Sequence, residues 1–186
     1  LIYSTSKADH IQHLTLVFDL MRKHTLYEKD SKYSFFMDKI EYLGHFISAA
    51  GVETDPRKIE AIANWPVPKN VKDLRSFLGL AGYYRKFIKG YAVISKELTD
   101  QLKKGSFHWD QKVQEAFTSV KSALISAPVL ALPDFQKVFV VETDASKSGI
   151  GAVLMQEQHP LAYLSKSLGP RWQKLSVYEK ELLAIV

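Results

Sequence analysis

Two acidic residues stand at the end of an apolar run in the segment VFVVETDASKSGIGAVL, residues 138–154. Glu142 and Asp144 are two residues apart, so they share one face if the run is a β-strand. Mg²⁺ prefers hard oxygen ligands, and a two-metal nuclease needs several carboxylates that converge from different elements. The spacing therefore allows a metal ligand here, although two acids that end a strand and solvate a turn would leave the same pattern.

A second pair of acids lies in YEKEL, residues 178–182. Glu179 follows Ser176 by three residues, which is the spacing of a capping box at the start of a helix. We therefore expect the Glu179 carboxylate to accept a hydrogen bond from the Ser176 amide. Glu181 lies about 200° further around such a helix and points to nearly the opposite side. Glu181 is thus the better candidate for a metal ligand, and Glu179 for a structural role.

A helix predicted over residues 71–89 has two different faces. Its core-facing side repeats apolar residues at helical spacing: Val71, Leu74, Leu78 and Ala81. The other side combines positive charge with a glycine and a tyrosine: Lys72, Arg75, Gly79, Tyr83 and Lys86. This second side suits a nucleic-acid backbone, because cations neutralise phosphates and a missing side chain permits close approach. A solvated basic face with a packing glycine is the alternative.

The positive charge of the chain is concentrated in its middle. The net charge is +5, and residues 56–104 carry 11 Lys/Arg and 4 Asp/Glu, a net charge of +7. Residues 1–55 have a net charge of −2 and residues 105–186 are neutral. This distribution favours an anionic partner for the middle segment. The chain has no cysteine, which excludes disulfides and favours an intracellular, cytoplasmic location, and no apolar run approaches the ~20 residues of a membrane span.

The pattern of apolar residues and helix breakers predicts an α+β fold. Strands are expected at residues 1–4, 39–48, 51–55, 137–143, 150–156 and 161–165, the last three as an antiparallel meander. Helices are expected at residues 8–24, 56–65, 71–89, within 96–105, at 110–125 and after Ser176.

Several long motifs resemble one known family. LRSFLGLAGYYRKFIKGY, residues 74–91, is preceded by YLGHFISAAGVETDPRKIEAIANWPVPKN and followed by FHWDQKVQEAF and APVLALPDF. Together these motifs closely resemble the reverse transcriptase of gypsy-type LTR retrotransposons over essentially the whole chain. The resemblance implies the C-terminal part of a polymerase palm at residues 1–55 and a helical thumb at residues 56–104. Residues 105–186 would form a linker helix and the first strands and helix of a ribonuclease H-like αβ domain.

The resemblance also implies roles for particular residues. YLGHFIS matches the primer grip, so the residues expected to contact the primer strand are Tyr42, Leu43, Gly44 and His45. Gly79 and Tyr83 match thumb positions that follow the minor groove of a template-primer duplex or RNA:DNA hybrid. Asp144 matches a metal ligand of the nuclease, and Glu181, immediately before LLAIV, matches its catalytic glutamate. Glu142 falls outside the matched ligand set, and Mg²⁺ is the implied cofactor.

The chain departs from the family pattern at the polymerase site. In the family, LIYS follows a Tyr-x-Asp-Asp hairpin whose aspartates bind the catalytic metal, and those aspartates are not in this chain. We therefore expect this chain alone not to extend a primer. Two further nuclease aspartates would follow Val186, so Asp144 and Glu181 are half of the implied site. In the longer protein, we expect Glu181→Gln to abolish hybrid cleavage, whereas Glu179→Gln mainly loosens the helix.

Three functions therefore remain open. The first is a piece of an RNA-directed DNA polymerase with ribonuclease H activity, whose other partner is the remainder of the polyprotein. The second is a non-catalytic nucleic-acid-binding remnant of a degenerate element, and the third is a host-adopted protein-binding scaffold. Absence of salt-dependent affinity for duplex would favour the third function, since phosphate binding weakens steeply with salt.

Overall fold

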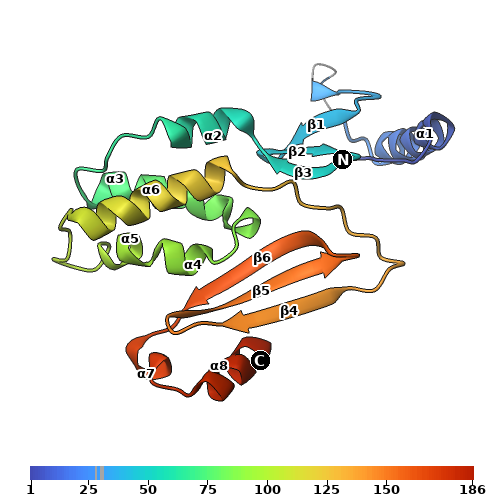
Figure 1. The fold of residues 1–186 in the computed structure, drawn as a ribbon. Helices are drawn as coiled ribbons and strands as arrows, with labels where there is room; N and C mark the ends of the chain where they lie inside the picture. Colours follow the sequence, from blue (N-terminus) through green and yellow to red (C-terminus); the bar gives the residue numbers. More distant parts are fainter. Residues whose placement is uncertain (28, 30–31) are drawn as a thin grey trace.

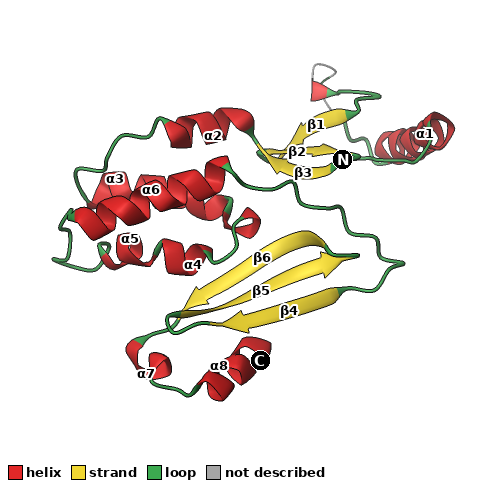
Figure 2. Ribbon diagram, in the orientation of Figure 1, coloured by secondary structure: helices red, strands yellow, loops and turns green. Residues whose placement is uncertain are grey.

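The computed structural model describes residues 1–27, 29 and 32–186. It is an α+β fold in which two three-stranded antiparallel sheets flank a group of helices (Figures 1 and 2). The first sheet has the order β1-β2-β3 and the second the order β4-β5-β6. The predicted fold class is therefore confirmed.

The N-terminal segment differs from its prediction. Residues 1–4 form no strand, because a strand needs a hydrogen-bonded neighbour and no described segment pairs with them. The predicted helix follows as α1 (Lys7–Lys23), capped by Ser6, whose side chain accepts a hydrogen bond from the Asp9 amide. None of the α1 residues is buried.

The first sheet contains three strands where two were expected. They are β1 (Lys39–Tyr42), β2 (His45–Ser48) and β3 (Gly51–Thr54). The expected strand 39–48 is a hairpin, because Leu43 and Gly44 both adopt positive φ angles, 49° and 69°, and reverse the chain. Two consecutive left-handed residues are what a tight two-residue hairpin turn requires.

The helical core begins with α2 (Pro56–Ala63), where Asp55 is the N-cap and accepts a hydrogen bond from the Arg57 amide. It continues with α3 (Val71–Tyr83), which ends earlier than the predicted residue 89. The chain bends at Tyr84 and continues as the 3₁₀ turn η2 (Arg85–Phe87). Three more helices follow: α4 (Tyr91–Ile94), α5 (Lys96–Asp100) and α6 (Gln111–Ile125).

The helices bury one continuous hydrophobic core. On α3 the fully buried residues are Leu74, Phe77 and Ala81, whereas the predicted core residues Val71 and Leu78 are only half buried. Phe77 packs against Phe117 of α6, with ring centres 4.6 Å apart. The buried face of α3 is therefore rotated slightly from the predicted stripe.

The second sheet is the predicted antiparallel meander, with β4 (Val140–Ala145), β5 (Gly149–Gln156) and β6 (His159–Ser167). A short helix, α7 (Pro170–Gln173), precedes the predicted final helix α8 (Val177–Ile185). The helix α4 packs on β6, whereas α8 packs on β4 and β5 from the opposite face of the sheet (Figure 1). In the part of the chain that the structure describes, no helix is long and apolar enough to cross a membrane.

Candidate nucleic-acid interface and metal site

Four of the five residues of the predicted basic stripe share one face of α3. Lys72, Arg75 and Gly79 are exposed, and the Tyr83 side chain is 50% exposed. The fifth residue, Lys86, lies on η2 because α3 ends at Tyr83. Its ammonium lies 5.3 Å from the ring centre of Phe87, and partial burial lowers the pKa of Lys86. The stripe is thus a solvent-facing cationic surface on α3 that ends beside η2.

Gly79 has no packing role within the described chain. A Cβ built at this position meets no heavy atom within 4 Å, and the backbone is in the middle of a helix. A glycine there costs about 0.5–1 kcal/mol of stability relative to alanine. The alternative reading of Gly79 as a packing glycine therefore finds no support, whereas close approach of an external partner would account for it.

The turn between β1 and β2 touches the C-terminal end of the stripe. The Tyr83 hydroxyl donates a hydrogen bond to the carbonyl oxygen of Leu43, and the Tyr84 hydroxyl donates to that of Gly44 at 2.8 Å. Tyr42 and Leu43 are exposed beside this contact, and Gly44 is half buried against it. The structure thus brings the predicted primer-contacting turn and the basic stripe together at Tyr83.

His45 lies beneath this turn in an aromatic environment. Its ring stacks on Tyr83, with centres 5.2 Å apart and an interplanar angle of 15°, and meets the edge of Tyr84 at 5.5 Å. Nδ1 of His45 is buried and has no hydrogen-bond partner among the described residues. Burial, and secondarily the charge of Lys86, lower the pKa of His45 below its usual 6.5. His45 is therefore placed as a neutral packing residue of the turn.

Asp144 lies near the end of β4 on the face of the second sheet that looks toward α4. It pairs with Gly151, which pairs with Ser165, and the Ser165 hydroxyl oxygen accepts a hydrogen bond from the Ala92 amide of α4 at 2.9 Å. Directly paired residues of an antiparallel sheet lie on the same face. Glu142 shares this face, and both acids line a hollow of about 340 Å³ between the sheet and α4.

Glu181 lies on α8, which covers the opposite face of the sheet. It does not line the hollow that contains Asp144. Glu179 accepts a hydrogen bond from the Ser176 amide at 2.7 Å, and the Glu179 amide donates to the Ser176 hydroxyl at 3.3 Å. The predicted capping box is therefore confirmed, and these bonds to Ser176 lower the pKa of Glu179.

The described residues do not form a complete metal site. They contain no group of three or more His, Cys, Asp or Glu side chains that could hold a metal ion. Asp144 shares a sheet face and a hollow with Glu142, whereas Glu181 lies on α8, which covers the other face of the sheet. Mg²⁺ at a nuclease centre needs more oxygen ligands than this arrangement supplies. The donor set of the described residues therefore does not by itself fit a resident magnesium ion.

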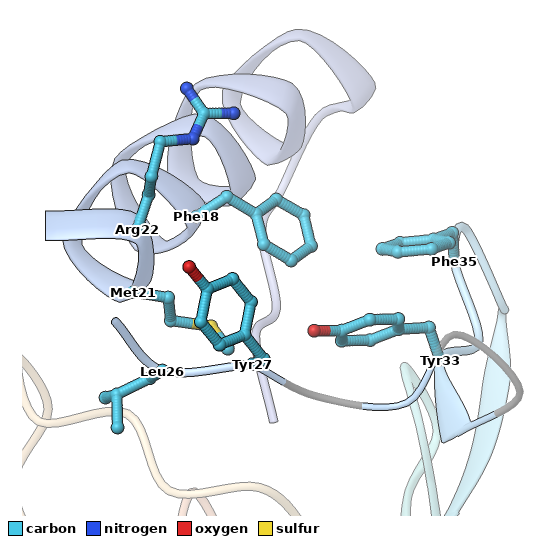
Figure 3. Close-up of a pocket in the computed structure, with 7 residues that line it drawn as sticks. All are labelled: Phe18, Met21, Arg22, Leu26, Tyr27, Tyr33 and Phe35. Atoms are coloured by element: carbon cyan, nitrogen blue, oxygen red, sulfur yellow. The ribbon is translucent and has the colours of Figure 1, made fainter. Parts of the chain in front are cut away.

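A larger hollow of about 550 Å³ lies between α1 and the segment that follows it (Figure 3). It is lined mainly by apolar and aromatic side chains: Phe18, Met21, Arg22, Leu26, Tyr27, Tyr33 and Phe35. Phe18 meets Tyr33 edge to face at 5.6 Å. None of the predicted site residues borders this hollow, and its described lining contains no carboxylate or histidine.

Sequence reasoning missed Tyr84, which the structure places at the centre of the contact between the turn and the helices. Its side chain is 1% exposed, and burial raises its pKa to about 12. The helix prediction over residues 71–89 placed Tyr84 on neither of its two faces. The adjacent Tyr83-Tyr84 pair was the available signal, since a buried tyrosine hydroxyl usually needs a hydrogen-bond partner.

The architecture is a hairpin sheet that touches a basic helical core, followed by a second antiparallel meander, and comparison with known proteins places it among reverse transcriptases with a ribonuclease H-like domain. Residues 109–186 match the model of the RNase H-like domain found in reverse transcriptase. The fold superposes on the foamy viral protease-reverse transcriptase in complex with an RNA/DNA hybrid with a TM-score of 0.90. That match has 23% identity and covers 99% of this chain and 26% of the viral chain. A foamy viral enzyme in complex with dsDNA gives a TM-score of 0.88 at 24% identity, over 98% of this chain and 40% of the viral chain.

Curated relatives identify the family more closely. The Pol polyproteins of the Drosophila melanogaster transposons 297 and gypsy are 43% and 41% identical to this chain over its whole length. The chain belongs to this family of retrovirus-related Pol polyproteins of gypsy-type transposons. It spans only 18% and 19% of the length of these two relatives. An uncharacterised mitochondrial protein of Arabidopsis thaliana is 46% identical over 70% of this chain and 84% of its own length.

Proposed function

We propose that this chain grips the duplex in a retrotransposon reverse transcriptase, binding a template-primer duplex or an RNA:DNA hybrid. One observation carries the proposal: the exposed basic face of α3, with Gly79 open to solvent, adjoins the β1–β2 turn through Tyr83. The cationic side chains that can neutralise phosphates, the bare backbone at Gly79 and the exposed β1–β2 turn form one continuous surface. The foamy viral enzymes of the same fold are described in complexes with an RNA/DNA hybrid and with dsDNA, which supports the proposal.

The domain assignment is part of this proposal. The hairpin sheet within residues 1–55 acts as the end of a palm, and the helices of residues 56–104 act as a thumb. Residues 105–186 act as a linker helix and the first part of a ribonuclease H-like domain. The continuous core between α2, α3, α5 and α6 supports a thumb packed tightly on the linker helix.

We assign RNA-directed DNA synthesis and hybrid cleavage to the longer protein of which the relatives are examples. The family resemblance implies Mg²⁺ as the cofactor of that longer protein, and segments outside the described residues would have to complete its donor set. Asp144 and Glu181 stay the proposed nuclease ligands on the strength of the family motif. An intracellular, cytoplasmic location, with a virus-like particle or the nucleus as family alternatives, accords with the absence of cysteine.

Titration of the 186-residue chain with a fluorescent DNA duplex at several salt concentrations tests the proposal. The logarithm of the binding constant should fall linearly with the logarithm of the salt concentration, with a slope of about −0.9 per phosphate neutralised. The double variant Lys72→Ala/Arg75→Ala should reduce the steepness of this slope by about 2. The matched control Lys147→Ala/Lys174→Ala removes the same charge from exposed sites outside α3 and should keep the slope. Salt-independent affinity, or equal loss in both variants, would refute the proposed surface.

A non-catalytic duplex-binding protein is a second candidate. The Arabidopsis relative favours it, because this chain covers 84% of that protein, so a separate protein of similar extent exists. Both candidates require salt-dependent duplex binding. They differ in hybrid cleavage by the gene product with its native flanking segments: Mg²⁺-dependent cleavage supports the enzyme, and binding without cleavage supports the second candidate.

A further inference from the structure

The β1–β2 turn has a backbone conformation that its own sequence does not favour. Leu43 has a φ angle of 49°, in the left-handed region, where a non-glycine residue costs roughly 1–2 kcal/mol. Its side chain is 71% exposed, so burial of that side chain does not compensate for the strain. A strained turn of this kind persists when the surrounding structure holds it in place.

Two consecutive tyrosines hold the turn through two consecutive carbonyl groups. The Tyr83 hydroxyl donates to the oxygen of Leu43, and the Tyr84 hydroxyl donates to the oxygen of Gly44 at 2.8 Å. The register pairs Tyr42 with His45, so Leu43 and Gly44 lie outside the strand pairing. The tyrosines therefore satisfy carbonyl groups that the sheet leaves without partners.

The end of α3 makes this double contact possible. Adjacent residues within a helix point about 100° apart and would not reach two neighbouring atoms of one turn. Tyr83 is the last residue of α3, and Tyr84 is its C-cap with φ −93° and ψ 8°. Their rings meet nearly at right angles, 86°, with centres 5.1 Å apart, so the two hydroxyls converge on the same turn.

The rings also support the turn from below. A Cβ built at Gly44 would lie 3.5 Å from the Tyr83 ring and 3.6 Å from the Tyr84 hydroxyl oxygen, so the backbone of the turn sits directly on both tyrosines. His45 fills the space behind them and stacks on Tyr83. Tyr84 is 1% exposed, so it cannot contact a partner molecule directly.

We propose that Tyr83 and Tyr84 form a tyrosine clasp, which fixes the β1–β2 turn against the end of α3 and so positions the exposed Leu43 beside the basic face. This inference rests on the proposed duplex binding and adds to it. The family motif assigns Tyr83 to the duplex, whereas the clasp makes Tyr83 and the unassigned Tyr84 positioning residues that act on the primer end through the turn.

The variant Tyr84→Phe tests the clasp, because it removes one buried hydroxyl and keeps the ring. Loss of a hydrogen bond of this kind changes a local equilibrium by about three- to tenfold. We expect amide hydrogen exchange across the turn, at Tyr42 to His45, to accelerate by about that factor. The matched control is Tyr91→Phe, which removes the hydroxyl of a half-buried tyrosine that packs against the helical core and is not one of the two donors to the turn carbonyls.

The second readout is binding of two DNA duplexes by the full 186-residue chain. One duplex is blunt, and the other has a recessed 3′ end with a fluorescent base at the primer terminus. Tyr84→Phe should reduce the preference for the recessed end by about three- to tenfold and leave the affinity for blunt duplex within about twofold. If Tyr84 only stabilised the fold, Tyr84→Phe would lower the affinities for the blunt and the recessed duplex by the same factor.

Three results would overturn the clasp: unchanged exchange at the turn, faster exchange with an unchanged preference for the recessed end, or no such preference in the wild-type chain. Failure of the proposed function is a different result, namely no salt-dependent affinity of the wild-type chain for either duplex. Exchange at the turn would still report the two hydrogen bonds in that case, so the two failures are distinguishable.

Discussion

Gly79 allows stability and binding to be separated by a single substitution. Because an added Cβ would meet no atom within 4 Å, Gly79→Ala should raise the free energy of unfolding by about 0.5–1 kcal/mol. The same methyl group would lie between α3 and a closely approaching duplex. We therefore expect duplex affinity to fall by about five- to tenfold, the effect of roughly 1 kcal/mol. Thermal denaturation and duplex titration measure the two effects on one sample.

Gly82→Ala is the matched control for this experiment. Gly82 lies in the same helix, but a Cβ there would be in ordinary contact, 3.8 Å from the Tyr91 hydroxyl oxygen. It should stabilise the helix without weakening duplex binding. A Gly79→Ala chain that is more stable and binds duplex as well as the wild type would contradict the proposed close approach.

His45 makes stability depend on pH near neutrality. Burial lowers its pKa in the folded chain, so the folded state resists protonation that the unfolded chain accepts at about pH 6.5. Its stabilising contribution is therefore present above the unfolded pKa and is lost as pH falls through the lowered folded pKa. Asp55 also has a lowered pKa, caused first by its hydrogen bond from Arg57, but it starts from 3.8 and titrates in a lower window.

The variant His45→Phe keeps an aromatic ring at this position and removes the titration. Its Tm should fall less than the wild-type Tm between about pH 7.5 and about pH 5.5. Lys86, the charged neighbour that also lowers the His45 pKa, stays in place in both chains. Identical Tm losses in the two chains would show that His45 does not carry this pH dependence.

At the scale of elements, the sequence predicted what local patterns determine. The capping box of Ser176 and Glu179 lies where residue type and spacing placed it, and α2, α3 and α6 begin within one residue of the predicted positions, because a helix start depends on neighbours a few residues away. The end of α3 at Tyr83 was missed, and with it the contact between Tyr84 and a turn 40 residues earlier in the chain, which leaves no local pattern in the sequence. The two predicted metal ligands illustrate the same limit. Periodicity separated Glu179 from Glu181, but only the strand register and the hydrogen bond from Ala92 to Ser165 show which face of the sheet Asp144 occupies.

At Gly51 and Val52 the first sheet contacts the linker, the segment between α6 and β4. Val52 and Leu130 exchange two backbone hydrogen bonds of 2.7 and 2.8 Å, and the Ala131 amide donates to the Pro160 carbonyl of β6 at 2.8 Å. A Cβ at Gly51 would lie 2.2 Å from the Leu130 oxygen, and the φ angle there is 131°. Gly51→Ala should therefore displace the linker and lower the free energy of unfolding by about 2–4 kcal/mol.

The variant Gly105→Ala measures the cost of backbone strain where an added Cβ makes no clash. Gly105 also has a positive φ, 74°, but a Cβ there would meet no atom within 4 Å. We expect Gly105→Ala to cost only about 1–2 kcal/mol. Chemical denaturation of both variants measures the difference, and equal losses would show that the close approach of Leu130 is not what requires glycine at Gly51.

For the whole molecule, the distribution of buried residues predicts an order of local stability. The fully buried side chains concentrate in the helical core, including Leu74 and Phe77 of α3 and Val120 and Leu124 of α6. In contrast, α1 has no buried residue, and β4 contains only exposed or half-buried ones. Segments with few buried apolar contacts open with a smaller free energy.

Amide hydrogen exchange should therefore be slowest in α3 and α6, faster in β4 and fastest in α1. β6 should exchange more slowly than β4, because it packs on η2 and α4 and is tied to the linker through Pro160. Mass spectrometry of peptides from each element measures this order, and equal protection of α1 and α6 would show instead that the chain opens as one cooperative unit.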